Sequence, residues 1–276
     1  MDTETKTVQD YKLKGNLITE VPIVGNLIWD EFGQEVLARH NERFRGIKGI
    51  EDTYDYKKGQ PISYSNVPRV LSYNMIMRVI SPNTHLLSPS EVVNYWDAIP
   101  EKDSTYADTD SIAVFPKECC NEDLRKRVLG ILGRSKIAIP LIVSGLGVDP
   151  VADGFIFTET DYIKTEEAPF LEKDGKVEYD AKKGIIPSEN GISIHTPPDQ
   201  KGLRWLCRDW SDLYAGCDDL LVSDSDGRVQ LIQDPKGRTE NLEAKLKLLQ
   251  EQRDRDLVEV NARYERASNH LRTGKF

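Results

Sequence analysis

The chain has 276 residues, of which 38% are hydrophobic and 30% are charged. This balance is typical of a folded globular protein and excludes a disordered chain, and the length allows one large domain or several smaller ones. The formal net charge of −9 opposes binding to DNA, RNA and anionic membranes, so we do not expect a nucleic-acid partner.

Membrane insertion and secretion are not expected either. The opening residues "MDTETKTVQD" lack the apolar core of a signal peptide. The longest apolar run, residues 137–148, contains Pro140 and is too short to span a bilayer. We therefore expect a cytoplasmic or virion-associated protein. Its cysteines show no Cys-x-x-Cys spacing, so they predict neither a metal site nor another cofactor.

Two helices are predicted in the first hundred residues, one on each side of a predicted strand region. The first covers residues 29–44, where the apolar residues and His40 share one helical face. Residues 62–80 are rich in β-branched and aromatic side chains and predict strand structure, with Pro68 at an edge or a break. The second helix covers residues 89–97, because Ser88 and Glu91 form a capping-box pattern.

Residues 111–144 predict a crossover unit. An apolar strand at 111–115 is followed by a helix at 122–132, capped by Asn121, and by a second strand at 137–144. A strand, a helix and a strand within this length indicate a right-handed crossover with parallel strands. Val128 lies on the helix face that we expect to be buried.

Three regions follow from these patterns: an α/β region at 1–150, a β-rich region at 151–234 and a helical arm at 235–276. The β-rich region contains short strand-like runs separated by Gly, Pro, Asn and Asp. The expected fold class is α+β, with a mixed body, a short βαβ unit, a β-rich second half and a long C-terminal helix.

Two short motifs suggest metal chemistry. Residues 106–111, "YADTDS", resemble the Tyr-x-Asp-Thr-Asp-Ser motif of family B DNA polymerases, and residues 209–216, "DWSDLYAG", are similar to another motif of that family. The resemblance implies a metal-dependent enzyme acting on phosphate esters, with Asp108, Asp110 and Asp209 as metal ligands. The two motifs stand in the reverse of the family order, and the family's lysine-rich helix motif does not lie between them.

A structural explanation competes with each candidate site. "DTDS" is also a good Asx-turn that leads into a strand. The loop at 144–154 gathers Ser144, Gly145 and Gly147 at the expected carboxyl edge of the crossover unit, where a phosphate could approach. This loop lacks a third glycine and a following helix, so a structural turn is the favoured interpretation.

The helical arm carries most of the functional prediction. Residues 239–276 contain oriented Glu–Arg and Glu–Lys pairs, and an eleven-residue spacing aligns a narrow apolar stripe on a nearly straight helix. The stripe comprises Leu242, Leu246, Leu249, Leu257, Val260, Tyr264 and Leu271. Because the stripe cannot stand alone in water, the helix must pack on its own body or on another subunit.

The sequence therefore favours a non-enzymatic structural or assembly protein, such as a virion component, whose partners are protein subunits in a homo-oligomer or a larger assembly. No catalytic residues, metal ligands or cofactors are assigned in this interpretation. The alternative is the metal-dependent phosphate-ester enzyme that uses Asp108 and Asp110.

Overall fold

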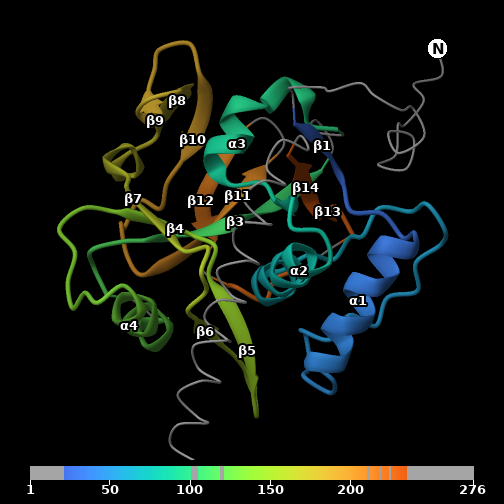
Figure 1. Ribbon diagram of the computed structural model, residues 1–276. Coiled ribbons are helices and arrows are strands. Elements are labelled where there is room, and N and C mark those ends of the chain that lie inside the picture. The colour runs from blue at the N-terminus through green and yellow to red at the C-terminus, as the bar shows by residue number, and fades with distance from the viewer. Residues whose placement is uncertain are drawn as a thin grey trace, which may run out of the picture.

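The computed structural model describes residues 22–100, 105–118, 121–209, 212–217, 219–223 and 225–234. Figure 1 shows its helices and strands in chain order. The helices are α1 (Glu31–Arg43), α2 (Val67–Ile80), α3 (Pro89–Asn94) and α4 (Glu122–Ile131). The strands are β1 (Ile23–Asn26), β2 (Thr84–Leu86), β3 (Tyr106–Val114), β4 (Leu141–Ser144), β5 (Gly147–Val151), β6 (Gly154–Thr158), β7 (Lys164–Glu167), β8 (Gly175–Asp180), β9 (Gly184–Pro187), β10 (Ile192–His195), β11 (Leu203–Asp209), β12 (Asp212–Cys217), β13 (Gly227–Arg228) and β14 (Gln230–Gln233).

A nine-stranded sheet forms the centre of the described chain. Its strands follow the order β7-β4-β3-β11-β12-β10-β8-β9, and β13 also pairs with β3. The pairs β10–β12 and β13–β3 are parallel, whereas the other pairs are antiparallel. The sheet is curled, and its two outer strands approach each other: a Cβ added to Gly184 of β9 would lie 3.8 Å from Oε2 of Glu166 on β7. The curl leaves a concave face.

Helix α3 packs against this concave face. It contacts β3 and β11 on one side and β8 and β9 on the other. Its position is set by a complete capping box, in which Ser88 Oγ accepts from the backbone N–H of Glu91 and the Glu91 side chain accepts from the backbone N–H of Ser88. This confirms the predicted helix start at Pro89.

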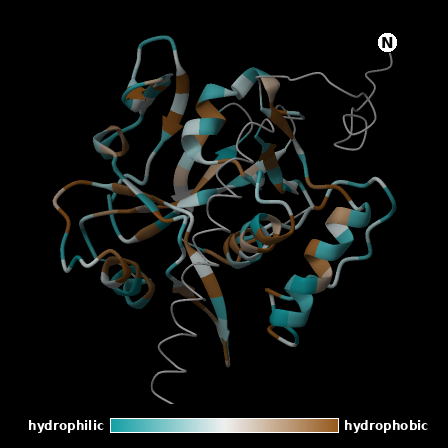
Figure 2. Cartoon of the chain, in the orientation of Figure 1, coloured by the Kyte–Doolittle hydropathy of each residue, from teal (hydrophilic) through white to brown (hydrophobic). Residues whose placement is uncertain are grey.

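Two hydrophobic cores lie on opposite faces of the sheet, because successive side chains on a strand point in opposite directions. On β3, Ile112 and Val114 join the larger core with residues of α1, α2 and α4. Ala113 and Phe115 join the second core, which includes Val92 and Val93 of α3. Figure 2 shows the accompanying pattern on α1, where hydrophobic and hydrophilic residues occupy different sides.

Two smaller sheets complete the described structure. Strands β1, β14 and β2 form a three-stranded antiparallel sheet. Strands β5 and β6 form a hairpin that extends past the main sheet in Figure 1 and contacts α2 and α4. Residues 144–154, which were predicted to be a loop, therefore consist largely of strand β5 and the turn that joins it to β6.

Helix α2 corrects the strand prediction for residues 62–80. The Asn66 side chain accepts a hydrogen bond from the backbone N–H of Arg69 at 3.2 Å, and Pro68 lies in the first turn, where a missing N–H costs nothing. Most of the helix is buried around its whole circumference. A helix with no exposed face shows no amphipathic period, so its β-branched residues suggested a strand.

The crossover prediction is wrong in its strand direction. Strands β3 and β4 are neighbours but antiparallel, with Ser111 opposite Ser144. The helix predicted between them exists as α4, and Val128 is fully buried as expected. The guanidinium of Arg125 on α4 donates to the carbonyl oxygens of Phe115 and Pro116, at 2.9 Å each. These bonds hold α4 beside the C-terminal end of β3. Strand β4 therefore begins at that end of the sheet and runs antiparallel to β3.

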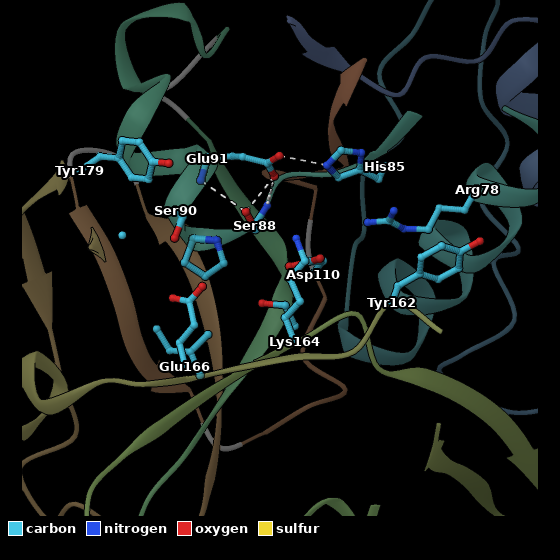
Figure 3. Close-up of a pocket in the computed structure, with 14 residues that line it drawn as sticks. Arg78, His85, Ser88, Ser90, Glu91, Asp110, Tyr162, Lys164, Glu166 and Tyr179 are labelled. Atoms are coloured by element: carbon cyan, nitrogen blue, oxygen red, sulfur yellow. Dashed lines mark hydrogen bonds and ion pairs between the residues drawn. The ribbon is translucent and has the colours of Figure 1, made fainter. Parts of the chain in front are cut away.

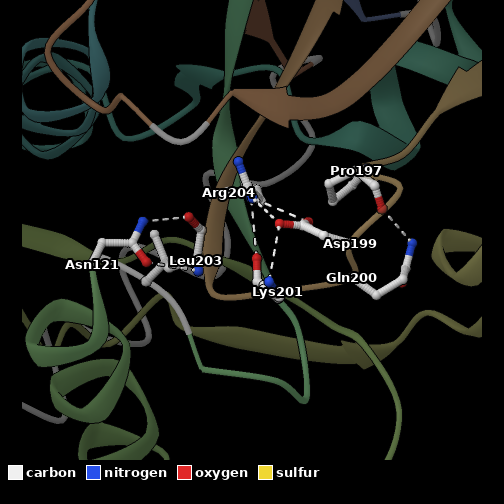
Figure 4. Close-up of polar contacts among 7 residues, drawn as sticks. All are labelled: Asn121, Pro197, Asp199, Gln200, Lys201, Leu203 and Arg204. Atoms are coloured by element: carbon white, nitrogen blue, oxygen red, sulfur yellow. Dashed lines mark hydrogen bonds and ion pairs between the residues drawn. The ribbon is translucent and has the colours of Figure 1, made fainter.

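Asn121 has a different role from the one predicted. Its side chain makes no capping bond to α4. Instead, its amide donates to the Leu203 carbonyl oxygen at 2.6 Å and accepts from the Leu203 N–H at 3.1 Å (Figure 4). Asn121 thus anchors the start of α4 to β11, close to the Arg204–Asp199 ion pair at 3.3 Å.

The predicted fold class is therefore wrong. A curled, mostly antiparallel nine-stranded sheet replaces the mixed body with a parallel βαβ unit, and strands from both sides of residue 150 belong to it. The predicted C-terminal helix and its seven stripe residues lie outside the described residues. Within the described residues, no helix has the length and hydropathy needed to cross a membrane.

Candidate functional site

A polar pocket of about 260 Å³ opens at the edge of the curled sheet (Figure 3). It is lined by residues from the end of α2, from β2, from the start of α3 and from strands β3, β4, β7, β8 and β9. The curl brings β7 and β9, the two outer strands of the sheet, to the same cavity. Segments that are distant in sequence therefore supply its walls.

The sheet register places two rows of side chains beneath the pocket. Ser111, Ser144 and Lys164 lie opposite one another across β3, β4 and β7. Ile142 lies opposite Glu166 in the next row. Directly opposite residues on neighbouring strands share a face, so Ser144, Lys164, Ile142 and Glu166 all reach the cavity.

Glu91 is held rigidly in the pocket wall. Its Oε1 lies 3.0 Å from Nε2 of His85, and its Oε2 accepts from the N–H and the hydroxyl of Ser88, both at 2.8 Å. Burial alone would raise the pKa of Glu91, but the bonds from His85 and Ser88 outweigh it and lower the pKa. Glu91 is consequently a fixed negative charge.

Asp110 is a buried carboxyl group beside this pair. Its Oδ1 accepts a hydrogen bond from Ser111 Oγ at 2.6 Å, and that hydroxyl lies 2.6 Å from Ser144 Oγ. Burial, aided by the negative charge of Glu91, raises the pKa of Asp110 to about 6, against the opposing effects of Ser111, Arg78 and His85. The charge of the pocket therefore changes within the range of mildly acidic pH.

Arg78 and Tyr162 form the opposite wall. The guanidinium carbon of Arg78 lies 4.6 Å from the centroid of the Tyr162 ring, a cation–π arrangement. The Nε atom of Arg78 is buried and has no hydrogen-bond partner among the residues that the structure describes. Within the described part of the chain, neither Arg78 nor Lys164 forms an ion pair with a carboxylate. The pocket thus contains two cationic groups that the protein does not neutralise by direct pairing.

The predicted metal ligands do not gather in this pocket. Asp108 and Asp110 are both buried within β3, so "DTDS" is part of a strand and not the expected surface turn. Asp110 lines the pocket, whereas Asp108 does not. Asp209 is exposed at the end of β11, opposite Tyr106 and Asp212. Among the described residues, no three His, Cys, Asp or Glu side chains are arranged to hold a metal ion.

Sequence reasoning singled out some of the site but did not assemble it. Asp110 and Ser144 were candidates for other reasons, and Glu91 was identified only as a capping residue. Arg78, Lys164 and Glu166 were missed. Lys164 and Glu166 alternate in "IKTEEA", which is a weak signal for two side chains on one face of a strand. Nothing local connects that strand to Arg78.

No protein-family model, no curated protein and no solved structure matches this chain.

Proposed function

We propose that the protein is a non-enzymatic binding protein that holds the anionic group of a small molecule at Arg78. The observation that carries this proposal is the guanidinium of Arg78, which lines the pocket, forms no ion pair among the described residues and has a buried Nε without a hydrogen-bond partner among them. A buried N–H without an acceptor is costly, and the cost is greater for a charged group. A carboxylate or phosphate bound in the pocket that Arg78 lines would give its guanidinium a counter-charge that the described residues do not supply by direct pairing.

The surroundings of Arg78 support the same ligand chemistry. The Tyr162 ring packs against the guanidinium and limits its freedom, which prepares it for directed hydrogen bonds. Lys164 adds a second cation to the lining of the same cavity. Guanidinium groups bind carboxylates and phosphates through paired N–H donors, and these charge-assisted bonds are shorter and stronger than neutral ones.

Calorimetric titration with inorganic phosphate, acetate and succinate tests the proposal. We expect at least one of these anions to bind, and Arg78→Gln to weaken that binding at least about tenfold, the equivalent of one charge-assisted bond. The matched control is Arg45→Gln, because Arg45 is exposed and does not line the pocket. Equal binding by the Arg78→Gln variant, with its fold intact by circular dichroism, would contradict the proposal.

An assembly role is a second proposal, and an aromatic cluster with the exposed Tyr54 at its outer edge favours it. Tyr54 is 44% exposed, and its ring centroid lies 4.7 Å from that of Tyr56 and 4.6 Å from that of Tyr64. Trp29 extends the cluster, 5.7 Å from Tyr56. Aromatic residues are enriched in protein interfaces, where they are frequent hot spots.

Native mass measurement tests the assembly proposal. We expect the chain to form an oligomer, and Tyr54→Ser to reduce its mass. Leu221→Ser is the control, because Leu221 is also 44% exposed but lies outside the aromatic cluster. An unchanged mass for the Tyr54 variant would exclude this cluster as the interface. The metal-dependent phosphate-ester enzyme stays a hypothesis that no described geometry favours.

A further inference from the structure

The pocket carries opposite charges at its two ends. Figure 3 shows Arg78 and Tyr162 at one end, and Glu166, Ser90 and Tyr179 at the other. Neither Arg78 nor Glu166 forms an ion pair among the described residues. The cavity therefore presents a cation and a carboxylate that have no direct ion-pair partner among the described residues.

The acidic end has the donor and acceptor pattern that suits an ammonium group. A primary ammonium donates three hydrogen bonds and accepts none. The carboxylate of Glu166 and the hydroxyls of Ser90 and Tyr179 all line this end of the cavity. Gly184 lines the pocket next to Glu166 and adds no side chain there, which leaves the carboxylate accessible.

A ligand with a single charge fits only half of this cavity. A simple anion at Arg78 would lie in the same small pocket as the carboxylates of Glu91 and Glu166, and like charges in a partly buried site repel. A simple amine would meet the guanidinium of Arg78 and the ammonium of Lys164. A molecule with both charges, held apart by a short apolar link, places each charge next to its opposite.

We propose that the ligand is a small amino carboxylate, with its carboxylate at Arg78 and its ammonium at Glu166. This inference rests on the proposed binding function and specifies the ligand class. Ile142, which lies opposite Glu166 in the sheet, contributes an apolar side chain to the pocket floor. That side chain would contact the carbon chain of the ligand.

Matched probes of one length separate this inference from simple anion binding. Calorimetric titrations would use γ-aminobutyrate, butyrate and butylamine, followed by shorter and longer amino carboxylates of the same series. We expect the best amino carboxylate to bind about fivefold more tightly than the acid or the amine of equal length, the equivalent of about 1 kcal/mol for an ion pair with the exposed carboxylate of Glu166.

Two neighbouring glutamates on β7 provide matched variants. Glu166→Gln should reduce the affinity for the amino carboxylate to that of the simple acid and leave the acid's own affinity unchanged or stronger. Glu167→Gln should change neither, because the side chain of Glu167 points to the opposite face of the strand and does not line the pocket. Arg78→Gln should weaken both ligands.

The outcomes distinguish the two proposals. If butyrate binds as tightly as every amino carboxylate and Glu166→Gln has no effect, the ligand class is wrong while anion binding at Arg78 stands. If butylamine binds as tightly as the amino carboxylates, the carboxylate contact at Arg78 is wrong. If neither these probes nor phosphate, acetate or succinate binds, both the proposed function and this inference are overturned.

Discussion

Two arginines on α2 have opposite environments. Arg69, in the first turn, donates to the carbonyl oxygens of Ile50, Tyr64 and Glu51 at 2.8, 2.6 and 2.8 Å. Arg78, in the last turn, stacks on Tyr162 and has a buried Nε without a partner. The first guanidinium is satisfied by the fold, whereas the second is not fully paired among the described residues. We therefore assign stability to the region around Arg69, and the proposed binding role to the region around Arg78.

The region around Arg69 is a network of buried polar side chains, in which His40 Nδ1 has no hydrogen-bond partner among the described residues. The carboxylate of Asp52 accepts hydrogen bonds from the hydroxyls of Tyr56 and Tyr73, at 3.0 and 3.1 Å. The ring of His40 stacks against Phe44, and its Nε2 lies 2.9 Å from the Ile50 carbonyl oxygen. Burial raises the pKa of the Tyr73 hydroxyl well above its ordinary value, so it stays a donor. This network joins α1, α2 and the loop between them.

Replacing each arginine by methionine gives the largest expected contrast. Arg69→Met removes the donor of the Tyr64 and Glu51 carbonyl oxygens and one of two partners of the Ile50 carbonyl oxygen, and we expect a loss of about 3 kcal/mol in the free energy of unfolding. Arg78→Met removes a group with an unsatisfied donor, and we expect a change within about 1 kcal/mol. Urea unfolding measures both. Equal losses would show that Arg78 is a structural residue.

The next largest expected effect is the pH dependence of the free energy of unfolding that comes from His40 in this network. Burial, aided by the charges of Arg69 and Arg43 and opposed by the Ile50 hydrogen bond, lowers the pKa of His40 to about 4 from 6.5. Between these values the unfolded chain binds a proton that the folded chain does not. Stability should therefore fall as the pH is lowered from 6.5 to 4, by about 3 kcal/mol from this residue.

Unfolding curves across that pH range, compared with those of His40→Gln, isolate this contribution. The variant is less stable at neutral pH, since it loses the packing of the ring, but its stability should depend less on pH. The same pH slope in both proteins would assign the acid sensitivity to other groups.

Asp110 should produce a smaller effect of opposite sign. Its folded-state pKa of about 6 lies above the ordinary value of 3.8, so the folded chain binds the extra proton between these values. Stability should fall as the pH rises through this window, and Asp110→Asn should remove that loss. We expect the variant to gain about 2 kcal/mol at pH 7 and nothing near pH 4.

Thermal or urea unfolding at the two pH values checks this prediction. Asp209→Asn is the matched control, because Asp209 is exposed, and it should show no such pH-dependent gain. If Asp110→Asn is destabilised at pH 7, the ionised carboxylate is needed in the fold. The contrast between the two polar regions would then be lost.

Local signals in the sequence predicted individual elements well. The capping pattern of Ser88 and Glu91 identified the start of α3, and the apolar period identified α1 with His40 on its buried face. The same approach failed for α2, because a helix buried on all sides has no polar face to reveal its period. The predicted crossover failed because strand direction depends on where the connecting helix is anchored.

The polar pocket could not be predicted from local patterns. Asp110 and Ser144 were singled out, but as parts of a metal motif and of a phosphate loop. Their common environment depends on the Ser111–Ser144 register and on the curl that brings β7 to β9. Arg78 and Glu166 belong to elements separated by several strands. Only their convergence in one cavity supports the shared role that we propose for them.

Composition, capping and apolar periodicity by themselves determined that the chain folds, where two of its helices begin or end, and which side chains these helices bury. These properties depend on neighbours within a few residues, so the sequence contains them directly. The direction of β3 against β4, the curl of the sheet and the unpartnered donor of Arg78 were decided by the tertiary structure. They depend on long-range pairing, in which residues distant along the chain compete for the same partners, and no local pattern encodes the result of that competition.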